Sequence, residues 1–391
     1  MAERPGPARS AAQRPAPLLL IPTGTGSEPS FGSYHAVLET GRRLLAAELS
    51  HRFGALGAAV VPLAPEPHAG EPFHWGRWFS HAARRALAAA PGAVPDAVGY
   101  AGAGALALAD DVLLDDLLSP IPGEVVANNR FSTDAFVVAG HPEHGNLEHA
   151  LEVLAACPTD NLATRSLADA GYAVRDLSSA AWSRFDVDTP LDLALLRLAA
   201  RAEGARPLGP GPARFLEMAT LPGGGRLEVP RLEALGAVIR DRSAELVLAG
   251  RVPAPLLAWL QSETACRVRA YVEERGMRAA PAATPRSLLA GRLRDSGPAA
   301  LVEELSTLGD AVVLDTRVLM AALAGSADAA TWPPAEERFA SDALDAGRIA
   351  TPWLRELAAA AGGAPVPVLL GGHGLVSDGL RILVAAAWHG R

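Results

Sequence analysis

Short apolar runs alternate with amphipathic helical patterns along most of the chain. In its first half, strands are predicted near residues 16–24, 57–63, 96–104, 123–129 and 135–140, with helices over 33–53, 77–90 and 110–118. This alternation is typical of layered folds in which helices cover a sheet. We therefore predict an α/β domain over residues 17–200, preceded by a flexible, Pro/Ala/Arg-rich segment over residues 1–16.

The same rhythm resumes after a Pro/Gly cluster at residues 201–215, which we interpret as a linker. Strands are predicted over 244–250, 266–274, 310–320 and 366–372, with a helix, turn and second helix over 282–305. The pattern indicates a second α/β domain over residues 216–391. We expect it to be smaller and Rossmann-like, with three layers.

Composition excludes several classes of protein. A net charge of −8 and 5% aromatic residues argue against a general nucleic-acid binder. All 35 basic residues are arginine, so Schiff-base lysines and a P-loop lysine are excluded. Phosphate would have to be bound by arginine, backbone N–H groups or a metal ion.

Cysteine usage and hydropathy bear on where the protein resides. The two cysteines, Cys157 and Cys266, have no metal-ligand spacing, which argues against a zinc site or a disulfide scaffold. The apolar run at residues 17–22 is too short for a signal peptide or a membrane span. We expect a soluble cytoplasmic protein that binds neither nucleic acid nor membrane. The sequence is compatible with a homodimer.

Two carboxylates, Asp186 and Asp188, stand two residues apart before a leucine-rich helix. In an extended strand both side chains would point the same way and could bind one cation. Thr189 is placed to cap the helix, Pro190 suits its first turn, and Asp192 follows three residues after the cap. The alternative is a well-capped strand-to-helix junction without a ligand.

Three further polar constellations lie in the first half of the chain. The glycine-rich loop after the first strand could surround a phosphate with backbone N–H groups, or could simply be a tight turn. The loop at residues 66–78 could hold a two-histidine metal site or pack its tryptophans. The two adjacent asparagines at residues 128–129 could bind a ligand at a strand end or form Asx turns. Their candidate residues are, respectively, Pro22, Thr23, Gly24, Thr25, Gly26 and Ser27; His68, His74 and Arg77; and Asn128, Asn129 and Arg130.

In the second half, polar residues follow several predicted strands. Gly371, Gly372 and His373 lie between a buried strand and an apolar helix, a natural place for an anion. If the strands are neighbours in a parallel sheet, one crevice could be lined by Asp315, Arg317, Glu274 and His373. The alternative is a set of ion-paired sheet ends.

The glycine-rich loop after the first strand, together with the late "FDVDTPLDLALL", resembles nucleotidyltransferases of the glycosyltransferase-A-type, nucleotide-diphospho-sugar-transferase-like fold. Within this group, the pattern resembles that of the molybdenum-cofactor guanylyltransferases and the phospholactate guanylyltransferases. The resemblance implies that the loop at residues 22–27 binds a nucleotide and that Asp186 and Asp188 help to hold Mg²⁺ under its phosphates. The chain departs from the family pattern because Glu28 stands in a loop without basic residues, and Gly102–Gly104 replaces a metal-binding carboxylate.

Three functions follow as hypotheses. The first is metal-assisted transfer from a nucleotide or nucleotide sugar to a small-molecule acceptor. The second is a catalytically silent nucleotide-binding or scaffold protein. The third is lyase or hydrolase chemistry in the second domain, with His373 acting beside Asp315 or Glu274, so that Asp188, His373 and Asp315 are the catalytic candidates.

Overall fold

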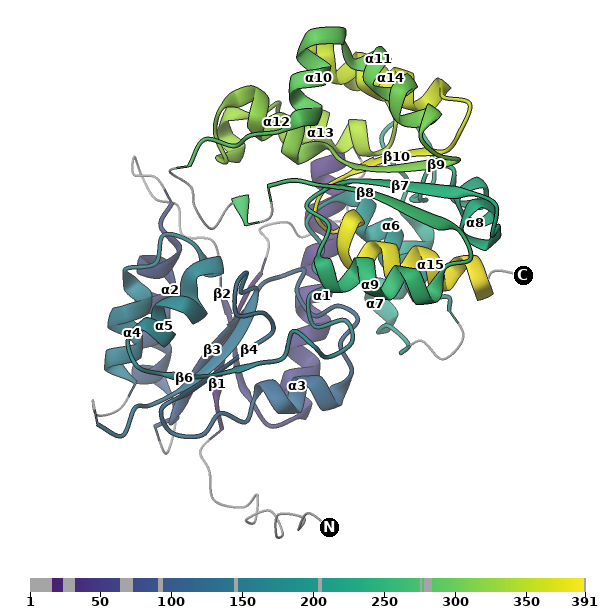
Figure 1. The fold of residues 1–391 in the computed structure, drawn as a ribbon. Helices are drawn as coiled ribbons and strands as arrows, with labels where there is room; N and C mark the ends of the chain where they lie inside the picture. The colour runs from purple at the N-terminus through teal and green to yellow at the C-terminus, as the bar shows by residue number, and fades with distance from the viewer. Residues whose placement is uncertain are drawn as a thin grey trace, which may run out of the picture. The chain divides into compact units, whose positions relative to one another are not determined.

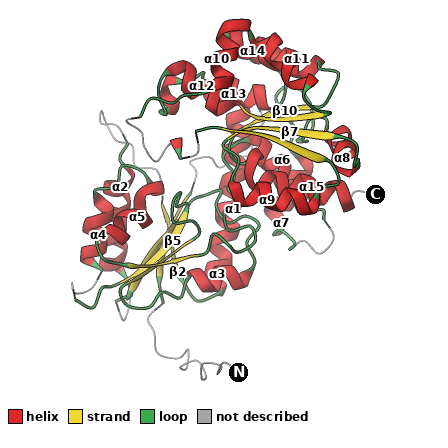
Figure 2. Cartoon of the chain, in the orientation of Figure 1, coloured by secondary structure: helices red, strands yellow, loops and turns green. Residues whose placement is uncertain are grey.

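A computed structural model describes most of the chain. The described residues are 16–23, 32–63, 73–90, 94–143, 147–202, 206–274, 276–277 and 283–389. They form an α/β protein with a six-stranded mixed sheet and a four-stranded parallel sheet (Figures 1 and 2). The α/β class predicted from the sequence is confirmed.

The chain forms two compact units, each built from more than one segment. Unit 1 comprises the described residues within 1–23, 49–103 and 109–183, and unit 2 those within 24–48, 104–108 and 184–391. Residues 184–200, expected in the first domain, therefore belong to unit 2. The expected linker at 201–215 contains the start of a helix, α7 (Pro210–Met218).

The sheet of unit 1 has the strand order β2-β1-β3-β5-β4-β6. Only β5 runs antiparallel to its neighbours; the other pairs are parallel. The strands are β1 (Leu18–Pro22), β2 (Ala59–Leu63), β3 (Ala97–Ala101), β4 (Glu124–Ala127), β5 (Ala135–Ala139) and β6 (Ala173–Asp176). The helices are the end of α1 (Tyr34–Ala55), α2 (Trp75–Ala89), α3 (Asp111–Leu117), α4 (Glu148–Ala155) and α5 (Ala163–Asp169).

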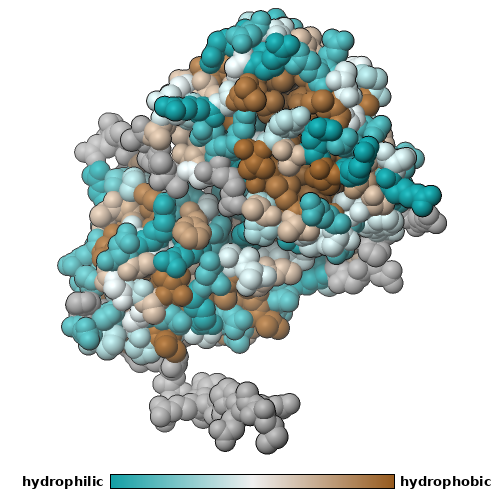
Figure 3. All heavy atoms as spheres, in the orientation of Figure 1, coloured by the Kyte–Doolittle hydropathy of each residue, from teal (hydrophilic) through white to brown (hydrophobic). Residues whose placement is uncertain are grey.

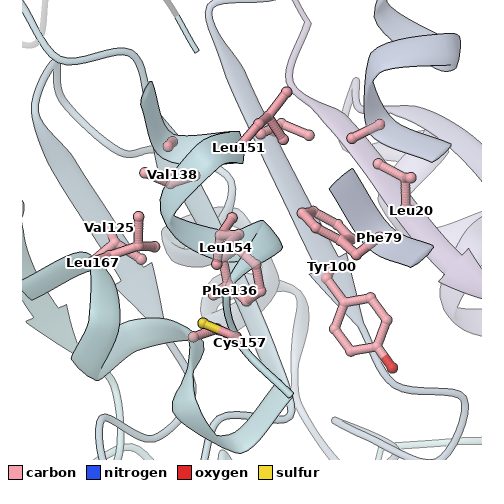
Figure 4. Packing of buried hydrophobic residues seen from close by; sticks show 14 of the residues in the cluster. Leu20, Phe79, Tyr100, Val125, Phe136, Val138, Leu151, Leu154, Cys157 and Leu167 are labelled. Carbon is pink, nitrogen blue, oxygen red and sulfur yellow. The ribbon is translucent and has the colours of Figure 1, made fainter. Parts of the chain in front are cut away.

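The core of unit 1 lies where α2, α4 and α5 pack on the sheet (Figure 4). The rings of Trp75 and Phe79 stack with centroids 5.0 Å apart, and both meet Tyr100 edge-on. Large aromatic side chains of this kind bury much apolar surface and dominate packing energy. Both tryptophans of the 66–78 stretch, Trp75 and Trp78, thus lie on α2 and are part of the core, as the packing alternative expected.

The sheet of unit 2 is entirely parallel, with the order β10-β9-β7-β8. Its strands are β7 (Glu245–Gly250), β8 (Arg267–Val272), β9 (Ala311–Asp315) and β10 (Val368–Gly371). In Figure 1, α10 to α14 lie over one face, and α8, α9 and α15 lie over the other. The helices of this unit include α6 (Pro190–Ala199), α8 (Leu232–Arg240), α9 (Ala254–Glu263), α10 (Leu288–Ser296), α11 (Pro298–Thr307), α12 (Thr316–Ala324), α13 (Ala335–Asp342), α14 (Pro352–Gly363) and α15 (Leu380–His389).

Two predicted strands differ in the structure. Residues 184–188 are coil, because the amides of Asp188 and Thr189 bond to a helix cap instead of to a strand. The run at 310–320 is β9 followed at once by α12, since Asp315 accepts the amide of Arg317 and starts the helix. None of the described helices combines the length and apolarity needed to cross a membrane.

Candidate functional site at the end of the parallel sheet

The start of α6 is fixed by a reciprocal cap. Asp192 Oδ2 accepts hydrogen bonds from the amide of Asp188 (3.1 Å), the amide of Thr189 (2.8 Å) and the Thr189 hydroxyl (2.9 Å). Thr189 Oγ1 in turn accepts the amide of Asp192. The cap and the role of Pro190 are as the sequence predicts. The cap holds the backbone of Asp188 in one position while its side chain stays exposed.

Asp192 is an unusual carboxylate because it is only 3% exposed. Burial, and next the negative charge of Asp188, raise its pKa from 3.8 to about 7, against the lowering effect of the Thr189 hydrogen bond. Desolvation penalises the charged form, and a like charge does the same. The start of α6 therefore concentrates negative charge that a cation or a proton would relieve.

Asp186 lies half-buried on the same segment. Its Oδ1 accepts the amide of Val187 at 2.9 Å. A Cβ atom at Gly104 would lie 2.8 Å from that oxygen, so only glycine lets the two backbones approach so closely. The carboxylate is thus held against the glycine segment that follows β3 in the chain.

The loop after β10 meets this cap. A Cβ atom at Gly374 would lie 2.4 Å from Asp192 Oδ1, and one at Gly371 would lie 2.6 Å from a methyl group of Leu375. His373, between these glycines, is exposed. The structure therefore joins two constellations that the sequence presents separately, residues 186–192 and the Gly-Gly-His-Gly loop.

Asp315 ends β9, next to β10 and β7 in the sheet, and is fully buried. Arg251 binds it with two hydrogen bonds, from Nε at 2.6 Å and from Nη2 at 3.1 Å. Burial acts to raise the pKa of Asp315, but Arg251, with smaller effects from His373 and Arg317, brings this pKa below its usual value. The order β9-β7-β8 makes β7/β9 the point at which connections diverge, where open α/β sheets generally bind ligands.

A second buried ion pair braces the same end of the sheet. Arg317 donates to both oxygens of Asp342, at 2.5 and 2.6 Å, and to the hydroxyl of Thr316. Thr316 donates to the carbonyl of Gly371. Arg317 therefore connects β9, β10 and α13, which is the ion-paired alternative that the sequence left open.

Glu274 lies apart from these residues. It follows β8, and β7 lies between β8 and β9 in the sheet, so two strand spacings of about 4.8 Å separate it from β9. Its Oε1 accepts the amide of Arg286 at 2.9 Å. The structure therefore brings Asp315, Arg317 and His373 together without Glu274.

Few of the nucleotide-loop candidates can be placed. Pro22 ends β1, and Thr23 donates its amide and its hydroxyl to the carbonyl of Leu63, at 2.8 and 3.1 Å. The Thr23 hydroxyl is thus used to hold β1 to β2. The candidates that lie outside the described residues are Gly24, Thr25, Gly26, Ser27 and His68.

The Asn pair forms a turn. Asn128 is buried; its Oδ1 accepts the amides of Asp134 and Ala135, both at 3.0 Å, and its Nδ2 donates to the carbonyl of Ser183. Asn129 Oδ1 accepts the amide of Phe131, as in an Asx turn. The Arg130 guanidinium lies over the Phe131 ring. These contacts match the turn interpretation of the motif.

The remaining loop candidates cap a helix. His74 is the N-cap of α2, and its Nδ1 accepts the amide of Arg77 at 3.4 Å. Within the part of the chain that the structure describes, no three His, Cys, Asp or Glu side chains form a group that could hold a metal ion.

The start of α1 carries a contact that the sequence does not reveal. Glu336 on α13 accepts the amides of Tyr34 at 2.7 Å and His35 at 2.9 Å, and the Tyr34 hydroxyl donates to Asp345. A carboxylate here complements the positive end of the helix dipole. The anion position at the start of α1 is thus filled by the protein itself. The partners are 302 residues apart, so no local pattern signals the contact.

Comparisons with known proteins do not assign a function to this site. The chain matches no model of a known protein family and no curated protein.

Proposed function

We propose that the protein binds a nucleotide or nucleotide sugar with Mg²⁺ and transfers a group from it to a small-molecule acceptor. The observation that carries this proposal is the cap at α6, which fixes Asp188 in an exposed position beside the buried carboxylate of Asp192. Two close carboxylates attract a divalent cation.

The donor set suits Mg²⁺. Asp186 and Asp188 offer carboxylate oxygens, and this ion commonly takes only one or two protein carboxylates, with phosphate oxygens and water as its other ligands. Asp192 is a positioning residue, because its Oδ2 already accepts three hydrogen bonds. When bound, Mg²⁺ would neutralise charge on the phosphates during transfer. The role of the chain is to hold Asp188 in place before the ligand arrives.

Thermal unfolding tests this proposal. GTP, CTP and a uridine-diphosphate sugar are each added with and without Mg²⁺. At least one of them should raise Tm, and more so with Mg²⁺, since a ligand at 100 times its Kd adds about 2.7 kcal/mol of stability. Asp188→Asn should abolish the Mg²⁺-dependent part of the shift. Asp115→Asn, at an exposed position on α3, is the matched control and should keep it.

Failure of every nucleotide and nucleotide sugar to shift Tm would overturn the transferase proposal. The result would favour the silent scaffold, which the contact of Glu336 with the start of α1 supports, because a phosphate could not take that position without displacing it.

A hydrolase or lyase is the second candidate, and it rests on His373. This histidine is exposed after β10, and its charge acts on the buried Asp315. Imidazole is the commonest general acid or base near neutral pH. Turnover of phosphate or carboxylate esters that is lost in His373→Gln, but kept in Asp188→Asn and in the surface control His81→Gln, would favour this candidate over the first.

A further inference from the structure

We propose that two copies of the chain form a two-fold dimer through β8, whose free edge pairs antiparallel with β8 of the second copy. Among the residues that the structure describes, this strand is at the edge of the four-stranded sheet and has β7 as its one partner (Figure 1). An edge strand presents unpaired N–H and C=O groups that can template pairing with another chain.

The other sheet edges carry features that discourage such pairing. Pro62 interrupts β2, and β6 has only four residues, among which Arg175 forms ion pairs with Asp116 and Glu124. The strand β10 is buried along its length. By contrast, β8 has six residues and no proline, and most of them are exposed. Among the described edge strands, β8 is therefore the one best suited to pair with another chain.

Hydrogen bonds to β7 show which residues of β8 face outward. The amides of Arg267 and Glu273 both donate towards β7, at 3.0 Å. Because backbone groups alternate along a strand, Val268, Ala270 and Val272 direct their N–H and C=O groups to the free edge. In an antiparallel ladder such residues exchange both hydrogen bonds with the residue opposite.

One register pairs all three outward residues. With the two-fold axis at Ala270, this residue faces its own copy, and Val268 faces Val272 of the second copy. Arg269 then lies opposite Tyr271 between these pairs, and Arg267 lies opposite Glu273 beyond them, at the ends of the paired segment. The arginines thereby meet a carboxylate and an aromatic ring, which are favourable cross-strand partners.

Exposure of the strand agrees with this arrangement. Val272 is 44% exposed, Ala270 is also exposed, and the Arg267 side chain is 70% exposed. Figure 3 shows hydrophobic residues gathered on the visible face of unit 2 in the region of β8 and α9. The valines and Ala270 share one face of the strand, so dimerisation would set the apolar rows of the two copies side by side on one face of a continuous sheet.

Sedimentation of the full chain tests the proposal. The protein should be a dimer at micromolar concentration. Ala270→Pro removes an outward N–H that makes no bond to β7, and Arg267→Glu sets like charges opposite each other twice, so each should weaken dimerisation about tenfold or more. Arg242→Glu makes the same charge change at an exposed turn and should have no effect. A monomeric wild-type chain, or a dimer that tolerates both edge variants, would overturn the proposal.

Cross-linking tests the register independently. Residues in a hydrogen-bonded antiparallel pair have Cα atoms about 5.5 Å apart, within the range that disulfides span. Ala270→Cys should therefore form a covalent dimer on mild oxidation, since both natural cysteines are buried. Ala173→Cys, exposed on the edge strand β6, is the control. Equal cross-linking of the two variants would show that β8 is not the interface.

Discussion

Asp192→Asn should change how the stability of the protein depends on pH. The wild-type carboxylate is buried and has a pKa of about 7, compared with 3.8 when it is exposed. A shift of about three units corresponds to about 4 kcal/mol. The folded state holds the proton more tightly than the unfolded state, so this group's contribution falls as pH rises from about 4 to about 7, and it stays low above pH 7.

Asparagine keeps an acceptor oxygen for the amides of Asp188 and Thr189 but cannot ionise. Relative to wild type, Asp192→Asn should therefore be similar or somewhat less stable at pH 4.5 and more stable at pH 8. The difference in unfolding free energy between variant and wild type should change by about 2 to 4 kcal/mol over that interval.

Urea unfolding in half-unit pH steps, in the presence of EDTA, measures this difference directly. Asp115→Asn, which removes an exposed carboxylate on α3, serves as the control. A flat difference curve for Asp192→Asn would refute the reasoning, because it would mean that Asp192 titrates alike in the folded and unfolded chain.

Three further substitutions test contacts on which unit 2 depends. Glu336→Gln removes the charge at the start of α1 and should lower the free energy of unfolding by about 1 kcal/mol, measured by urea titration at low salt. Gly250→Ala should cost more than about 2 kcal/mol, seen as a lower Tm, because φ is +117° and the new Cβ would lie 2.4 Å from that of Asp315. Asp342→Ala leaves Arg317 buried without its counter-charge and should cost about 3 to 5 kcal/mol by chemical unfolding, whereas Arg317→Met combined with Asp342→Leu should recover much of this loss.

Local signals in the sequence predicted local structure well. The Thr-Pro-x-Asp sequence specified the cap of α6, and the apolar runs specified nine of the ten strands, because both depend on residues within a few positions of each other. The edge strand β6 was not predicted, since its four residues carry no apolar run. The same locality explains the turn at Asn128 and Asn129, where the hydrogen bonds are formed mainly within residues 128–135.

Long-range contacts decided what the sequence left open. The order of the strands separates Glu274 from Asp315, although both residues lie at the carboxyl ends of strands in one parallel sheet. Contact of Gly374 with Asp192 joined two motifs that are 182 positions apart. Neither fact has a local pattern, since each depends on which elements pack together after the chain has folded.

The hydrogen bonds from the first turn of α1 to Glu336 also constrain when this part of the protein can fold. Ribosomes add roughly 5 to 20 residues per second, so the 302 positions between the partners take about 15 to 60 s to synthesise. Throughout that interval the nascent helix lacks the carboxylate that later completes its first turn. The segment from residue 32 to residue 48 thus emerges well before the residues that complete its final surroundings.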